Sequence, residues 1–77
     1  MSRLLIDREL MTWEAFASGG PFGYPTSPKI VFFCLSDPDR RGRFVSYEGD
    51  NADAERAVHT LSDQELVSLL EQAQELD

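Results

Sequence analysis

Apolar side chains recur at three- and four-residue steps near the end of the chain. These positions are Leu66, Leu69, Leu70, Ala73 and Leu76. That spacing lines one face of an α-helix and leaves polar residues for the opposite face. Ser62 precedes Glu65 by three positions, which is the spacing of a capping box at a helix start. The pattern therefore predicts an amphipathic helix over about residues 63–76.

A continuous run of β-branched and aromatic residues, KIVFFCLSD, occupies residues 29–37. Such a run is typical of a strand that is covered on both faces. Residues 43–49 follow as a second strand, and the loop between them contains proline, aspartate and glycine, which favour turns. We therefore expect an antiparallel hairpin, with Arg40 and Arg41 at its tip and Arg43 at the start of its second strand.

The first part of the chain fits two interpretations. Met11, Trp13 and Ala15 alternate with polar residues, which favours strands over about residues 3–7 and 10–17. A helix through the second of these segments is the alternative, because Leu10, Trp13 and Phe16 would share a helical face. Residues 19–28 contain three glycines and three prolines and are expected to form a loop. Residues 51–61 fit either a short helix or an extended segment.

These elements together predict an α+β fold in one small domain that spans residues 1–77. We expect an antiparallel sheet of three or four strands, with the single C-terminal helix packed across one face. The strand at residues 29–37 is apolar on both faces, but one helix covers only one of them. This shortage of cover predicts a protein partner or self-association, of which a homodimer is one form.

The acidic residues are concentrated in the second half of the chain. The formal net charge is −7, and residues 1–43 carry six bases against five acids, whereas residues 44–77 carry one base against nine acids. That acidic part would repel nucleic acid, so no direct nucleic-acid binding is expected. The chain shows neither the apolar segment of a signal peptide nor a membrane span, which leads us to expect a cytoplasmic protein without membrane contact.

No catalytic, cofactor or metal site is evident in the sequence. His59 is the sole histidine and Cys34 the sole cysteine, and we expect a buried thiol and a surface histidine rather than a reactive pair. Asp50, Asp53 and Glu55 resemble part of a calcium loop but lack its pattern. We therefore expect no enzyme activity, no cofactor and no bound metal.

Two groups of residues are candidates for binding a partner. Phe22 and Tyr24 stand between prolines and could form a rigid aromatic anchor, or their rings could fold back over a thin core. Arg40, Arg41 and Arg43 could grip a phosphate or carboxylate, or could pair with the acids beside them.

These features favour a non-enzymatic protein-interaction module that serves as a regulator or accessory subunit. The alternative is an acidic mimic or inhibitor, which would occupy a basic, nucleic-acid-binding surface of another protein.

Overall fold

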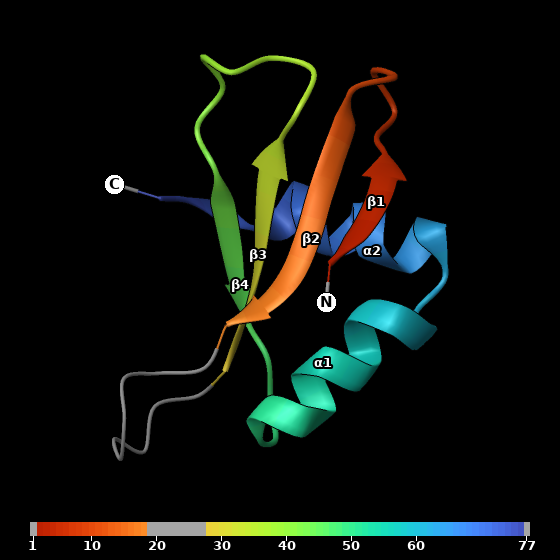
Figure 1. Cartoon of the computed structure of the whole chain (residues 1–77), viewed down its shortest axis with the longest axis vertical. Helices are drawn as coiled ribbons and strands as arrows, with labels where there is room; N and C mark the ends of the chain where they lie inside the picture. Colours follow the sequence, from red (N-terminus) through yellow and green to blue (C-terminus); the bar gives the residue numbers. More distant parts are fainter. Residues whose placement is uncertain (1, 19–27, 77) are drawn as a thin grey trace.

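The computed structural model describes residues 2–18 and 28–76, which form one antiparallel sheet with two helices on one of its faces (Figure 1). The five strands lie side by side in the order of the sequence, and each pairs antiparallel with the next. The elements, in chain order, are β1 (Arg3–Ile6), β2 (Thr12–Ser18), β3 (Lys29–Cys34), β4 (Arg43–Ser46), α1 (Asn51–Thr60), α2 (Asp63–Gln72) and β5 (Gln74–Glu75).

The predicted α+β class and antiparallel sheet are confirmed, and the open alternatives are decided. The second N-terminal segment is strand β2 rather than a helix, because Trp13 and Ala15 alternate into the core. Residues 51–60 form helix α1, for which the Asp50 side chain accepts a hydrogen bond from the backbone N–H of Asp53. The helix therefore begins at a side-chain cap, which satisfies one of its free N–H groups.

The prediction of at most four strands and one helix was wrong, and so was the end of the last helix. Helix α2 begins at its Ser62 cap as predicted, but it ends at Gln72 rather than at residue 76. Residues 74–75 pair instead with β4, and the Leu76 N–H donates to the Gly42 carbonyl at 2.7 Å. In a last helical turn, the backbone groups of these residues would bond partly to water. The free edge of β4 offers them backbone hydrogen bonds instead, so tertiary pairing overrides the apolar periodicity.

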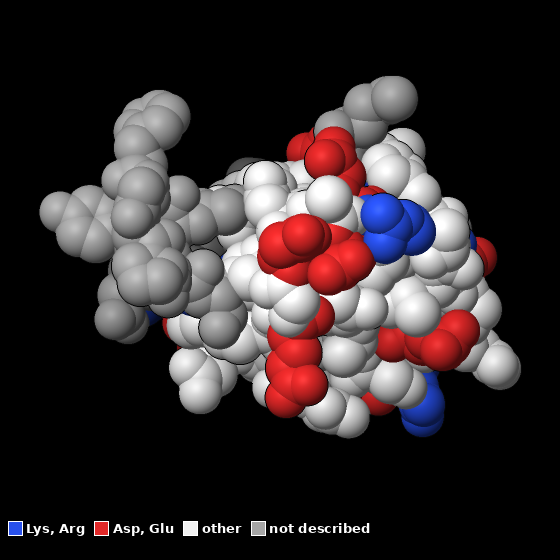
Figure 2. Space-filling view, turned by 90° about the horizontal axis from the view of Figure 1, so that it is seen from below, with Lys and Arg blue, Asp and Glu red and all other residues white. Residues whose placement is uncertain are grey.

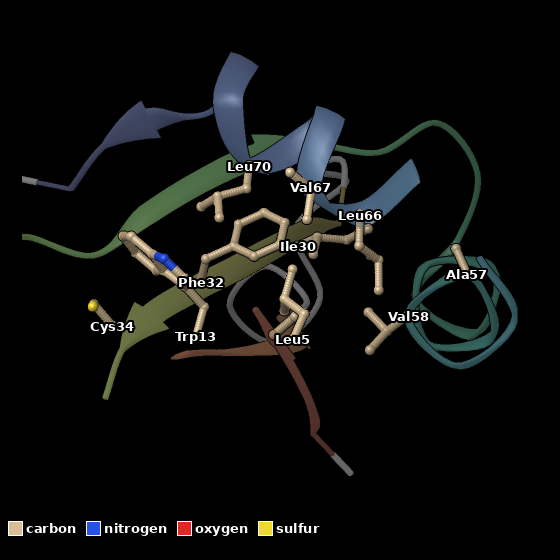
Figure 3. Close-up of a cluster of buried hydrophobic side chains, with 11 residues drawn as sticks. Leu5, Trp13, Ile30, Phe32, Cys34, Ala57, Val58, Leu66, Val67 and Leu70 are labelled. Atoms are coloured by element: carbon tan, nitrogen blue, oxygen red, sulfur yellow. The ribbon is translucent and has the colours of Figure 1, made fainter. Parts of the chain in front are cut away.

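The core lies between the sheet and both helices. Trp13, Ile30 and Phe32 project from the central strands and are fully buried. Val58 from α1 and Leu66 and Leu70 from α2 meet these side chains from the opposite layer (Figure 3). Burial of each large side chain contributes about 1.5–3 kcal/mol, so this one layer of contacts holds the helices to the sheet.

The turn between β1 and β2 is held by the carboxylate of Asp7. Its Oδ1 atom accepts hydrogen bonds from the backbone N–H groups of Glu9 and Met11, both at 2.9 Å. Its Oδ2 atom accepts from the indole N–H of Trp13 at 2.8 Å. Burial acts to raise the pKa of Asp7, but these bonds and the charge of Arg40 outweigh it, so the pKa lies below its ordinary value.

Candidate interaction surface

The face of the sheet opposite the helices exposes large apolar side chains. Leu4 and Ile6 of β1 are 60% and 58% exposed, and Phe33 and Leu35 are 41% and 53% exposed. Within the described residues, both helices pack on the other face (Figure 1). We call this uncovered side the outer face.

The strand register arranges the exposed side chains of the outer face in two rows. In the first row, Glu14 pairs with Leu4 on one side and with Phe33 on the other. In the second row, Ile6 pairs with Thr12, whose carbonyl accepts from the N–H of Leu35 at 2.8 Å. We call these six residues the outer patch: Leu4, Ile6, Thr12, Glu14, Phe33 and Leu35. Two apolar columns thus flank a polar column on β2.

Next to the outer patch, the outer face is also apolar, but its side chains are less exposed to solvent. The rings of Phe16 and Phe33 stack with their centroids 5.7 Å apart, and Val31 is buried. The Lys29 ammonium lies 5.2 Å from the centroid of the Phe44 ring. Glu14 and Lys29 are the ionisable residues of the described strands whose register places them on this face, so the face is close to neutral.

The three candidate arginines have different surroundings. Arg43 begins β4 on the helix side, where its guanidinium lies 5.4 Å from the centroid of the Trp13 ring and its Nη1 donates to the Leu70 carbonyl at 3.4 Å. Its buried Nε has no hydrogen-bond partner among the described residues. Arg40 lies 3.9 Å from the carboxylates of both Asp37 and Glu9.

Arg41 is exposed in the loop between β3 and β4. The structure therefore does not bring the three guanidinium groups together on one surface. The other candidates, Phe22 and Tyr24, lie outside the described residues.

The residues that the sequence offered as candidates for catalysis or metal binding are placed apart or have structural roles. Cys34 is buried at one end of the core, and His59 is exposed on α1, which packs at the other end (Figure 3). Asp50 and Asp53 cap the start of α1. A hydrogen bond from the Asp50 backbone, with the Arg56 side chain second, holds the pKa of Asp53 below its ordinary value.

Among residues 2–18 and 28–76, no group of three His, Cys, Asp or Glu side chains is arranged to hold a metal ion. A groove with a volume of about 510 Å³ lies between the end of β1 and the start of α2. Its lining is Ile6, Asp7, Arg8, Asp63, Gln64, Val67 and Ser68. Arg8 pairs with Glu71 at 3.2 Å and Asp63 with Arg3 at 2.6 Å, so these two charges at the groove have partners within the chain.

The sequence analysis placed its candidate binding residues in loops and at the start of one strand, and it did not identify the outer patch. The signal was present in residues 3–6, where Leu4 and Ile6 alternate with the buried Leu5.

In the part of the chain that the structure describes, no helix has the length and apolar character needed to cross a membrane. No protein-family model, curated protein or solved structure matches this chain.

Proposed function

We propose that this chain is a non-enzymatic protein-interaction module that binds a protein through its outer patch and acts as a regulator or accessory subunit in the cytoplasm. The observation that carries the proposal is the set of four large apolar side chains, each at least 41% exposed, on one side of the sheet. Side chains of this kind that form a contiguous patch are typical of protein-binding surfaces.

The polar column on β2 also favours a specific protein contact over non-specific hydrophobic association. Glu14 stands between Leu4 and Phe33, so a protein that covers the outer patch must offer a hydrogen-bond donor or a cation to its carboxylate. Ser2 supplies one donor from within the chain, with its Oγ 2.7 Å from Glu14 Oε2. An apolar surface without such a donor would leave the remaining acceptor capacity unsatisfied, which disfavours it.

The acidic-mimic function is the second candidate, because acidic side chains predominate over the described surface seen from below in Figure 2. Helix α2 carries three acids and no base. All three are engaged within the chain: Asp63 with Arg3, Glu71 with Arg8, and Glu65 with the backbone and side chain of Ser62. A mimic needs carboxylates that are available to a basic partner, so this arrangement favours the outer patch.

Site-specific photo-crosslinking tests the proposal. A benzophenone-bearing phenylalanine replaces Leu35 in the outer patch, and in a matched protein it replaces Ser68 on the exposed side of α2. Each purified protein is irradiated in an extract of the source cells. We expect a discrete adduct from position 35. An adduct to a different protein should be suppressed by excess unmodified protein but not by excess Ile6→Glu protein.

The pattern of adducts separates the two candidate functions. An adduct from position 68 alone, suppressed by high salt, would replace our proposal with the acidic-mimic function, since exposed charge pairs are screened by salt. Absence of a discrete adduct from position 35, whether to another protein or to a second copy of the chain, would overturn the outer patch as a binding surface.

A further inference from the structure

The two rows of the outer patch are complementary to each other, and from this we infer that the patch binds a second copy of the same chain. This inference rests on the proposed function and names its partner. It does not require any residue outside residues 2–18 and 28–76.

In such a dimer, the outer faces of two copies stack on each other. A two-fold axis that lies between the two sheets, perpendicular to their strands, places the first row of one copy against the second row of the other. Leu4 then faces Ile6 of the second copy, and Phe33 faces Leu35 of the second copy. Two-fold dimers use the same surface on both subunits, so each contact occurs twice. Apolar side chains from both outer faces would meet at a sheet separation of about 10 Å.

The same axis gives the buried Glu14 carboxylate a hydrogen-bond donor from the second copy. It places Glu14 against Thr12 of the second copy, and the threonine hydroxyl can donate to the carboxylate. Because neighbouring rows are about 7 Å apart along the strand, the two Glu14 carboxylates are offset rather than opposed. An axis that runs along β2 would instead place Glu14 on Glu14, which like-charge repulsion disfavours.

The charge of the whole chain does not oppose this dimer strongly. Both helices lie on the far side of the sheet from the outer patch, so the acids of α1 and α2 point away from the second copy. A standard stable interface covers about 800 Å² on each partner, and six side chains on three strands provide less. We therefore expect a concentration-dependent equilibrium between monomer and dimer rather than a permanent dimer.

Sedimentation velocity of the purified full chain, from about 5 µM to about 500 µM, tests the inference. Wild-type protein should move from the mass of a monomer towards that of a dimer. Thr12→Lys sets an ammonium against each Glu14 and should tighten the dimer by about threefold to tenfold at low salt, an effect that high salt removes. Ile6→Glu sets a new carboxylate against Leu4 and should weaken the dimer by about tenfold or more.

Charge-matched controls remove the effect of net charge alone. Thr60→Lys and Thr60→Glu make the same charge changes on the exposed end of α1, where the neighbouring groove includes no residue of the outer patch, and should leave the association unchanged. Leu35→Glu replaces Ile6→Glu as the loss variant if the latter fails to fold. Equal association of Thr12→Lys and Thr60→Lys would overturn the inference.

A wild-type protein that remains a monomer at the highest concentration would also overturn the dimer. The photo-crosslinking result then decides whether the proposed function falls with it. A competed adduct between position 35 and another protein would preserve the outer patch as a binding surface for a different partner. Where the wild-type protein does associate, an adduct from position 35 whose mass is that of two chains would support both conclusions, and excess unmodified protein should not suppress it because that protein is itself the partner.

Discussion

Replacing Asp7 with alanine tests how the turn between β1 and β2 is anchored to the core. The carboxylate accepts two backbone N–H groups in the turn and the indole N–H of Trp13. Water can replace the acceptor for the turn amides, because Glu9 is exposed and Met11 is partly exposed. Water cannot easily replace it for the indole, because Trp13 is fully buried.

The expected cost of Asp7→Ala is the sum of these two parts. An unpaired buried donor costs about 1–3 kcal/mol, and each exchanged turn bond costs about 0.5–1.5 kcal/mol or less. Allowing for overlap between them, we expect the free energy of unfolding to fall by about 2–4 kcal/mol. For a domain of this size, that loss lowers Tm by about 10 °C or more.

Asp37→Ala is the matched control. Asp37 also accepts the backbone N–H of the residue two positions later, at 3.1 Å, but it has no indole partner. Its loss should cost about 1 kcal/mol or less. Urea denaturation followed by the fluorescence of Trp13 measures both variants, and equal midpoints for the two would refute the role assigned to the indole bond.

The lowered pKa of Asp7 gives the same reasoning a pH dependence. A carboxylate whose pKa is lower in the folded state contributes stability above its unfolded pKa of about 3.9. That contribution is lost as the pH falls through the lower folded pKa. The stability of wild-type protein should therefore fall more steeply below about pH 4 than that of Asp7→Asn. Parallel curves of unfolding free energy against pH would show that Asp7 carries no such linkage.

Four further substitutions test the packing and the start of helix α2 by urea denaturation. Gly42→Ala should cost about 1–3 kcal/mol, because an added Cβ would lie 2.6 Å from the Phe33 ring; an unchanged midpoint would contradict that close approach. Leu66→Ala should cost about 2–5 kcal/mol and Leu69→Ala clearly less, since only Leu66 is fully buried; equal losses would contradict the observed orientation of α2. Ser62→Ala should cost about 1 kcal/mol through the lost cap, and wild-type stability in this variant would argue against the capping box.

The start of α2 was predictable and its end was not, for reasons that lie in the type of interaction. The cap involves Ser62 and Glu65, which are three residues apart, so local sequence contains the whole signal. The end depends on Leu76 reaching the Gly42 carbonyl, a contact between residues far apart in the chain. The apolar periodicity continues through residues 73–76 and favours a helix there, but it contains no information about a free strand edge elsewhere.

The outer patch was harder to predict than the core because exposure depends on both layers. The sequence indicated that Phe33 and Leu35 share a strand face and that this face lacks cover. It did not show that Leu4 and Ile6 lie beside them through β2, because that requires the register of β1 with β2 and of β2 with β3. Single-strand alternation gives the face of each residue, and only the pairing gives its neighbours.

Arg43 shows why a cluster in sequence need not be a cluster in space. Arg41 and Arg43 are two residues apart, but Arg43 begins β4 and points to the helix side, where the Trp13 ring and the carbonyl end of α2 attract its charge. The Arg43 side chain therefore lies between the sheet and the helices. Because the Arg43 side chain is not on the outer face, Lys29 is the cation that the described strands place on that face. The result is a face of low net charge on an acidic chain, which is the condition under which two copies can approach with little repulsion.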